Sequence, residues 1–351
     1  MKIGIQYRSN LLPKELKNNG FLLVELPYGE DLSDPDIKTV GVIVKLDESN
    51  GTDFANALAL AHKKNAVYLV VDTRGQKTTD KLYAIVQQMR DTFADARVTV
   101  CIENSYVFDA NGHIGYSDYS EYGMLCEIVQ SCNQIVGTER FGICLNMGYC
   151  NLLGQNIRKM ITGTAAHLKV FHMNDNDGKH DMHQIPYTFT TGRGSLATDV
   201  YRAVGALMAM HFEGFVIFDT GGAFQRIPQT LQGAYLNLLH GIWQVWEEES
   251  HFEEKLCQPG KSILLFGAGA MAGTYLENWG EKYPPVCLID NNPKLWGTKR
   301  YGYDIKPPAY MTEIPQEERL VLICNVYYDE VAKQLQEMHI PFDYFWDQYY
   351  I

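Results

Sequence analysis

Short hydrophobic runs alternate with amphipathic stretches through the first 256 residues of the chain. Eight runs are apolar along almost their whole length, which is typical of parallel strands that are buried on both faces. These runs are residues 3–7, 21–26, 40–46, 67–71, 98–102, 141–145, 168–171 and 215–218. Helix-period segments lie between them at residues 54–64, 81–93, 122–136, 198–210 and 231–246, whereas residues 31–39 are too few for a full helix. The pattern predicts a (β/α)8 TIM barrel with one reduced helix, since such a barrel needs roughly 250 residues.

A second α/β unit is expected to follow, so we divide the chain into residues 1–256 and 257–351. A predicted strand at 262–266 runs directly into Gly267-x-Gly269-x-x-Ala272 and a helix at 271–279. The next strand, at 286–289, ends in Asp290, about twenty residues beyond the glycines. This order is the dinucleotide-binding fingerprint, in which helix N-terminal amides face phosphates and the acid binds a ribose hydroxyl.

The second unit therefore has two interpretations. Gly267, Gly269, Ala272 and Asp290 are candidates to bind NAD or a sugar nucleotide in a Rossmann-like domain. The unit has only about half the length of a complete Rossmann domain, so a structural or oligomerising module is the alternative. An NAD-dependent oxidoreductase is disfavoured, because no catalytic domain of that kind accompanies the glycine loop.

Composition and charge narrow the range of partners. Hydrophobic residues make up 46% of the chain, which is enough for a packed core, and the formal net charge is −12. An acidic chain is a poor partner for nucleic acid, whose binding depends on Lys and Arg contacts to phosphate. No apolar run approaches 18 residues, and Cys101, Cys144, Cys287 and Cys324 lie inside apolar strands without a CxxC pair. We expect a cytoplasmic protein with no signal peptide and no membrane partner, and a homo-oligomer stays open.

Potential metal ligands gather after the seventh predicted strand. His172 ends this strand, and His180, Asp181 and His183 follow within the next eleven residues. Imidazole and carboxylate groups are common metal ligands. Barrel enzymes build their sites at the carboxyl ends of strands, where Glu103, Asn146 and Asp219 also stand. These residues are therefore expected to surround one pocket.

The barrel resembles the xylose isomerase-like sugar phosphate isomerase/epimerase superfamily over roughly residues 1–250, most strongly from 98 to 220. The matching segments are Cys-Ile-Glu103-Asn104, Ile-Cys-Leu-Asn146-Met-Gly-Tyr149, Val-Phe-His172-Met-Asn-Asp, Asp181-Met-His183, Pro186, Gly192-Arg-Gly194 and Phe215-Val-Ile-Phe-Asp219. The resemblance implies a divalent metal (Mn, Mg, Co or Zn) bound by Glu103, Asn146, His172 and Asp219. It also implies that Glu103 and Asp219 exchange a proton with a keto-sugar. Asp181, His183, Tyr149, Lys45 and Arg193 are then candidates to contact the substrate or to support the ligands.

The sequence departs from the family pattern at three of these positions. Asn146 stands where the family has an Asp, Tyr149 where it usually has a His, and Asp219 where it has a Glu. An asparagine can offer a carbonyl oxygen to a hard cation, but it brings no charge, so metal affinity should fall.

Two functional hypotheses follow. The first is a metal-dependent sugar (phosphate) isomerase or epimerase. The second is an altered, non-catalytic barrel that binds a carbohydrate, with the second unit as a nucleotide or sugar-nucleotide sensor. The second unit resembles small Rossmann modules of sugar-nucleotide and surface-polysaccharide proteins. A simpler interpretation also stands, in which His172 is a hydrogen-bonded histidine at the barrel mouth and Asp181 pairs with His183 in a loop.

Overall fold

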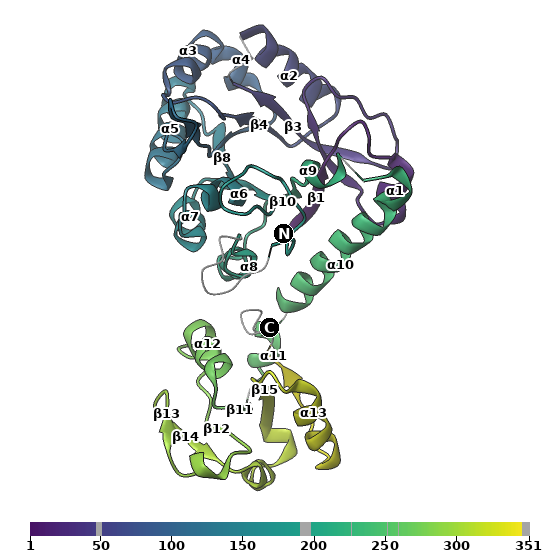
Figure 1. Cartoon of the computed structure of the whole chain (residues 1–351). Coiled ribbons are helices and arrows are strands. Elements are labelled where there is room, and N and C mark those ends of the chain that lie inside the picture. Colours follow the sequence, from purple (N-terminus) through teal and green to yellow (C-terminus); the bar gives the residue numbers. More distant parts are fainter. Residues whose placement is uncertain (47–50, 190–197, 226, 251, 259, 346–351) are drawn as a thin grey trace. The chain divides into compact units, whose positions relative to one another are not determined.

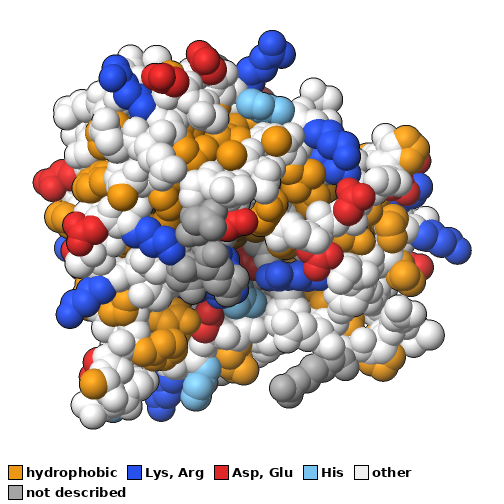
Figure 2. Space-filling model, turned by 90° about the horizontal axis from the view of Figure 1, so that it is seen from above, with side chains coloured by type: hydrophobic (Ala, Val, Ile, Leu, Met, Phe, Trp, Pro, Cys, Tyr) orange, Lys and Arg blue, Asp and Glu red, His pale blue; other side chains and the backbone are white. Residues whose placement is uncertain are grey.

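The computed structural model describes residues 1–46, 51–189, 198–225, 227–250, 252–258 and 260–345. The contacts divide the chain into two compact units, Met1–Trp246 and Glu247–Ile351 (Figure 1). Within the described ranges, no helix is both long and apolar enough to cross a membrane. Lysine, arginine, aspartate and glutamate side chains are interspersed on the face shown in Figure 2, as they are along the sequence.

The first unit is a closed barrel of eight parallel strands, which confirms the predicted fold. The strands are β1 (Lys2–Gln6), β2 (Leu23–Pro27), β3 (Lys38–Lys45), β4 (Tyr68–Asp72), β5 (Thr99–Glu103), β8 (Phe141–Asn146), β9 (Leu168–Met173) and β10 (Phe215–Phe218). They are ordered β1-β10-β9-β8-β5-β4-β3-β2 around the barrel. Each strand coincides with one of the eight apolar runs, because strands buried on both faces leave a continuous hydrophobic signal.

Helices surround this barrel. They are α1 (Pro13–Asn18), α2 (Gly51–Lys63), α3 (Asp80–Gln88), α4 (Arg90–Asp95), α5 (Tyr122–Val136), α6 (Met147–Leu152), α7 (Ile157–Thr164), α8 (Val200–Ala209), α9 (Gly221–Phe224) and α10 (Gln232–Ser250), with η1 (Gln229–Leu231) before the last. No helix forms in the described stretch between β2 and β3, which confirms the reduced element. The predicted helix at 81–93 is instead two helices, α3 and α4, which meet at Met89. A short hairpin of β6 (Val107–Phe108) and β7 (Ile114–Gly115) follows β5.

Apolar side chains close the lower part of the barrel. Tyr68, Cys101, Cys144 and Phe215 belong to one buried cluster there, and the Tyr68 and Phe215 rings lie 5.2 Å apart. Gly41 faces the Tyr68 ring so closely that a Cβ atom would lie 2.0 Å from it. Both cysteines behave as small buried hydrophobic residues, as expected. The packed lower half leaves the carboxyl ends of the strands to carry polar groups.

The second unit is a six-stranded sheet ordered β13-β14-β12-β11-β15-β16. Its elements are α11 (Phe252–Leu256), β11 (Ser262–Phe266), α12 (Ala270–Trp279), β12 (Cys287–Ile289), η2 (Pro293–Leu295), β13 (Lys299–Arg300), β14 (Tyr303–Lys306), η3 (Pro308–Glu313), η4 (Gln316–Glu318), β15 (Arg319–Ile323), α13 (Tyr328–Glu337) and β16 (Asp343–Tyr344). Among the described strands of this unit, only β13 and β14 pair antiparallel. The aromatic composition from residue 342 onward predicts packing on the barrel or on a second subunit. Phe345 instead packs on Phe252 and Tyr275 of its own unit, and residues 346–351 lie outside the described ranges.

The two glycines of the fingerprint loop differ in backbone conformation and in the space for a side chain. Substituting each of them therefore gives a matched test of the stability of the second unit. Gly267 has φ +126°, and a Cβ atom there would lie 2.3 Å from the Cys324 carbonyl oxygen. Gly267→Ala should therefore lower the free energy of unfolding by about 2 kcal/mol or more. Gly269→Ala should cost at most about 1 kcal/mol, since its added Cβ meets open space and only the N-cap worsens. Hydrogen exchange of the β11 amides in the full chain measures both, and equal effects would contradict this account.

Candidate functional site

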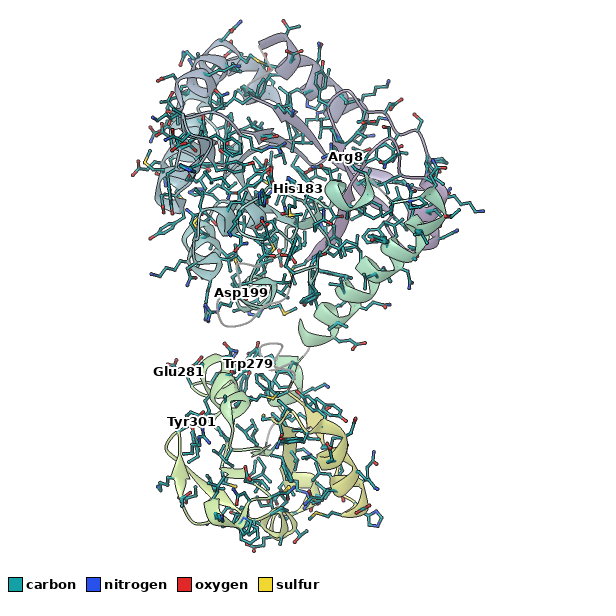
Figure 3. All side chains as sticks on the ribbon, in the orientation of Figure 1. Arg8, His183, Asp199, Trp279, Glu281 and Tyr301 are labelled. Carbon is teal, nitrogen blue, oxygen red and sulfur yellow. The ribbon has the colours of Figure 1, made fainter. Side chains whose placement is uncertain are left out.

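A pocket of about 590 Å³ opens at the carboxyl ends of the barrel strands. Its walls are built from strand ends and the segments that follow them. They include Gln6 and Arg8 at the end of β1, Lys45 from β3, Asp72 and Arg74 at the end of β4, Glu103 from β5, Tyr149 from α6, His183 from a loop, and Asp219 after β10. Figure 3 places Arg8 and His183 within the barrel unit. Glu103, Asp219, Tyr149, His183 and Lys45 were all predicted to lie near one pocket, and they do line it. Arg193 lies outside the described residues.

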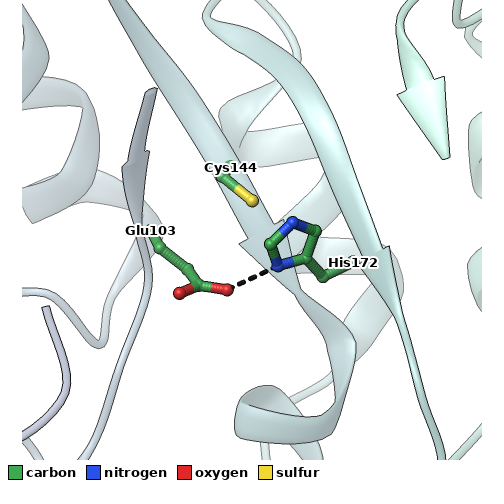
Figure 4. Close-up of side chains that lie close together, drawn as sticks. All are labelled: Glu103, Cys144 and His172. Carbon is green, nitrogen blue, oxygen red and sulfur yellow. Dashed lines mark hydrogen bonds and ion pairs between the residues drawn. The ribbon is translucent and has the colours of Figure 1, made fainter. Parts of the chain in front are cut away.

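His172 lies between two carboxylates. Its Nδ1 is 2.7 Å from Glu103 Oε1 and its Nε2 is 3.1 Å from Glu25 Oε2 (Figure 4 shows the Glu103 contact). The side chains of all three residues are at most 1% exposed. Gln6 adds a hydrogen bond from its Nε2 to the other oxygen of Glu25, at 3.0 Å. Both edges of the imidazole are thereby engaged by residues of other strands.

The two carboxylates beside His172 favour the protonated form of its imidazole ring. Burial alone would lower the pKa of His172, but Cys144, Glu25 and Glu103 raise it well above the usual value. The protonated ring can donate from both nitrogens, one to each carboxylate. Burial raises the pKa of Glu103, while the charge of His172 acts in the opposite direction.

Cys144 joins His172 and Glu103 in a buried group that could hold a metal ion. One ligand atom from each residue lies within 4.8 Å of the others. The sequence predicts Cys144 only as a small hydrophobic residue. Its place on β8 gave a signal, because it stands two positions before Asn146, so both side chains point to the same side of the strand.

Asn146 connects the two predicted acid/base residues. Its Nδ2 donates to Glu103 Oε1 at 3.1 Å and to Asp219 Oδ2 at 3.3 Å. Its Oδ1 accepts from the Gly148 backbone N–H at 3.0 Å and from Asn174 Nδ2 at 2.9 Å. Since a backbone N–H can only donate, the carbonyl oxygen must face Gly148 and the amide must face the carboxylates.

The four predicted metal ligands thus come together, but they do not present four ligand atoms to one cation. Asn146 turns its nitrogen toward Glu103 and Asp219, and both nitrogens of His172 are engaged. His172 is also fully buried and is not among the described residues that line the pocket. The observed side-chain orientations do not fit a metal centre formed by these four residues. That they bind a metal stays a prediction.

A second chain of charges runs along the other side of the pocket. His183 lies 2.9 Å from both Asp219 Oδ2 and Asp181 Oδ1 through its two ring nitrogens. Arg74 binds Asp72 with its Nη2 at 2.7 Å and approaches Asp181 at 3.4 Å, and its guanidinium lies 5.8 Å from the Tyr149 ring centroid. Asp181 and His183 therefore form a pair, as the simpler interpretation held, and His183 of this pair lines the pocket.

The charges of this chain shift its pKa values in opposite directions. Burial would raise the pKa of Asp219, but His183, His172 and Arg8 hold it well below its usual range. Burial would lower the pKa of His183, but Asp219 and Asp181 raise it well above its usual value. Asp219 is accordingly a carboxylate and His183 an imidazolium at neutral pH.

Local backbone geometry seats His183 in this position. Its φ is +47°, in the left-handed region that non-glycine residues seldom adopt. Gly222 makes room for it, because a Cβ atom there would lie 2.0 Å from the Met182 carbonyl oxygen. Strain of this kind persists where the surroundings enforce it, which is common at functional sites.

Several site residues were not among the predicted set, although they stand at strand ends. Gln6 and Asp72 end β1 and β4, Arg8 follows β1, and Glu25 lies within β2, two residues before its end. A polar residue at the end of an apolar run was their only signal. That signal does not distinguish a site residue from a solvated one, so it could not select them.

Comparison with known proteins supports the fold. The chain matches no family model, and a search of curated proteins found no match. Among solved structures, an L-ribulose 3-epimerase matches with a TM-score of 0.52 and 13% identity, covering 74% of this chain and 100% of that one. A D-allulose 3-epimerase from Methylomonas sp. matches with a TM-score of 0.50 and 10% identity, covering 70% and 98%. At such identities the likeness shows the fold alone. The first unit shares the closed parallel barrel fold of these two structures.

Removing one partner of His172 should be strongly destabilising. Glu25→Gln keeps the shape of the side chain but removes a buried charge, so the free energy of unfolding should fall by about 3 kcal/mol. Urea denaturation measures the loss. Asp36→Asn is the control, because it breaks an exposed ion pair with Lys17 and should leave stability nearly unchanged. A similar small effect of both changes would contradict a structural role for the Glu25–His172 contact.

Stability should also depend on pH with a defined sign. The lowered pKa values of Asp219 and Asp181 stabilise the fold above their unfolded values, and this contribution is lost as the pH falls. The raised pKa values of His172 and His183 stabilise it below their unfolded values, and this contribution is lost as the pH rises through the folded ones. Both contributions are complete between about pH 4 and 6.5. The thermal midpoint should fall on the acid side of this window, and less steeply in Asp219→Asn; an unchanged slope would contradict the assignment.

Proposed function

We propose that the barrel is a sugar isomerase or epimerase that moves a proton between Glu103 and Asp219 and its substrate. One observation carries the proposal: two carboxyl groups with opposite pKa shifts line the same pocket and are linked by one amide. Environments that push two pKa values apart are how enzymes make one carboxyl group an acid and another a base.

The pocket suits a monosaccharide in size and polarity. Its volume of about 590 Å³ is within the range of small-molecule sites. Arg8 Nε and Asp219 Oδ1 are buried atoms of lining residues, and they have no hydrogen-bond partner among the described residues. A hydroxyl group both donates and accepts, so a polyhydroxylated ligand can satisfy both atoms.

The proposed chemistry balances within the pocket. Asp219, as the carboxylate, takes the proton from a carbon beside the substrate carbonyl, and an enediol(ate) forms. Glu103, whose pKa is raised by burial, returns a proton to this carbon or to its neighbour. Arg8 and His183 line the same pocket, where their positive charge favours the developing oxyanion. Return to the opposite face of the same carbon gives an epimer. Return to the neighbouring carbon, while the hydroxyl proton on the first carbon passes to the former carbonyl oxygen, gives an isomer.

Proton exchange with solvent provides the test. Incubation in D2O with ketoses, aldoses and their phosphates should put deuterium on the carbon beside the carbonyl of the true substrate. Free ketoses are the first compounds to try, because the two structural neighbours are named as epimerases of ribulose and allulose. Glu103→Gln and Asp219→Asn should each slow exchange by about 100-fold or more.

The control for this experiment is Asp36→Asn, a change at an exposed residue that does not line the pocket. It should retain exchange while the other two variants lose it. A sugar that raises the thermal midpoint of the wild-type chain without any deuterium uptake would instead favour the second hypothesis, a barrel that binds a carbohydrate but does not transform it.

We also propose that the second unit binds NAD or a sugar nucleotide at its glycine loop. The loop stands between β11 and α12, and the Ala268 backbone N–H donates to Asp290 Oδ2 at 3.1 Å. Ala272 is fully buried in α12, as the fingerprint requires where the helix packs on the sheet. Asp290 Oδ1 accepts from the Asn292 backbone N–H, yet a carboxylate has further lone pairs for ribose hydroxyls.

Thermal protection of the full chain tests this second proposal. NAD or a UDP-sugar should raise the midpoint of the second unit, since a ligand that binds the folded state alone stabilises it. Gly269→Asp should abolish the shift, because a negative side chain at the start of α12 would occupy the phosphate position. A shift that survives Gly269→Asp would leave the loop with a structural role only.

A further inference from the structure

The side chain of Asn146 occupies the point where the Glu103 and Asp219 carboxylates meet. Two carboxylates at one point repel each other unless positive charge or hydrogen-bond donors lie between them. A primary amide has two N–H groups, and Nδ2 of Asn146 donates to one oxygen of each residue, at 3.1 and 3.3 Å. The amide thus satisfies both carboxylates in the way that a shared cation otherwise would.

The orientation of this amide is set by three neighbouring groups. Oδ1 of Asn146 accepts from the Gly148 N–H, as the N-cap of α6, and from Asn174 Nδ2. The Asn104 side chain holds the backbone of the same residue, accepting from the Asn146 N–H at 2.5 Å and donating to its carbonyl at 3.1 Å. Turning the amide over would break two hydrogen bonds and place its oxygen against two carboxylates.

Atoms of two further candidate ligands, Glu103 and His172, are engaged as well, whereas Asp219 Oδ1 has no hydrogen-bond partner among the described residues. Glu103 Oε1 accepts from both Asn146 Nδ2 and His172 Nδ1, and His172 Nε2 contacts Glu25. A metal ion at this point would have to displace several buried hydrogen bonds at once. Each of these would then leave an unpaired buried polar group, which is costly.

We propose that the Asn146 amide takes the place of a metal ion between Glu103 and Asp219, so that the pocket binds its ligand without a divalent cation. The inference concerns the same pocket as the proposed function, but it does not depend on whether the pocket is catalytic. It predicts that replacing one atom, the amide nitrogen of Asn146, is enough to turn this site into a metal site. Asn146→Asp replaces that nitrogen with a charged oxygen and brings three carboxylates to one point.

Metal binding of the full chain tests the inference directly. Dialysed wild-type protein should contain substoichiometric Mn, Co, Zn and Mg by elemental analysis, and MnCl2 should not raise its thermal midpoint. Asn146→Asp should bind Mn2+ at least about tenfold more tightly than the wild type, because it adds a negatively charged ligand. In that variant, MnCl2 should raise the thermal midpoint. Asn133→Asp is the matched control, since this buried asparagine of α5 accepts from the Arg140 and Phe141 backbone N–H groups and does not line the pocket.

If Asn146→Asp fails to fold, the metal content of the wild-type protein still tests the inference. Stoichiometric metal that persists through dialysis and is lost in Glu103→Gln or Cys144→Ser would overturn the inference. So would an Asn146→Asp variant that folds and binds Mn2+ no better than Asn133→Asp.

The deuterium-exchange experiment separates this inference from the proposed function. Exchange that continues in the presence of EDTA supports both. A metal-free wild-type chain that exchanges no proton of any sugar would contradict the proposed enzyme activity. It would not contradict the inference that the Asn146 amide replaces a metal ion. Exchange that EDTA abolishes and Mn2+ restores would contradict the inference about the Asn146 amide. It would not contradict the proposed enzyme activity.

Discussion

The site depends on one buried interaction, the imidazole of His172 held between Glu25 and Glu103. A carboxylate alone in a water-excluding barrel would be costly to bury, and so would a lone imidazolium. Together they are paired, and each then supports the next group along a hydrogen-bonded chain. From Glu103 the chain continues to Asn146 and Asp219. The polar upper half of the barrel is stable because no member of this chain stands without a partner of opposite charge or a hydrogen bond.

This chain also explains why five carboxyl groups can surround the site. Glu25 and Glu103 share His172, and Asp219 and Asp181 share His183, while Asp72 binds Arg74. His172, His183 and Arg74 thus supply the positive charge that balances these carboxylates. Electrostatic preorganisation of this kind requires a rigid frame, which eight parallel strands with a packed apolar lower half provide.

The fold could be read from the sequence to a greater extent than the site could. Buried parallel strands leave continuous apolar runs, so the hydrophobic pattern alone locates all eight barrel strands. The short helix α6 left no periodic signal, because five of its six residues are buried. The resemblance to a sugar isomerase superfamily placed Glu103, Asn146, His172 and Asp219 around one point. It could not show that Asn146 points its nitrogen there, because Gly148 and Asn174 decide that orientation.

Contacts between distant residues were beyond the reach of any local pattern. Glu25 lies 147 positions from His172 in the sequence, and only closure of the barrel brings them together. The left-handed conformation of His183 likewise depends on Gly222, whose lack of a side chain leaves room for the Met182 carbonyl oxygen. Side-chain partners across a barrel are a property of its register, which periodicity does not encode.

The missing helix between β2 and β3 has a consequence for how this barrel can change. Tyr28, Gly29 and Glu30 form part of the pocket wall from a stretch that carries no helix. Insertions in such a loop disturb neither the strand register nor the core, and their entropic cost grows slowly with length. This side of the barrel is therefore where the size of the accepted ligand can evolve, or be engineered, independently of the residues that act on it.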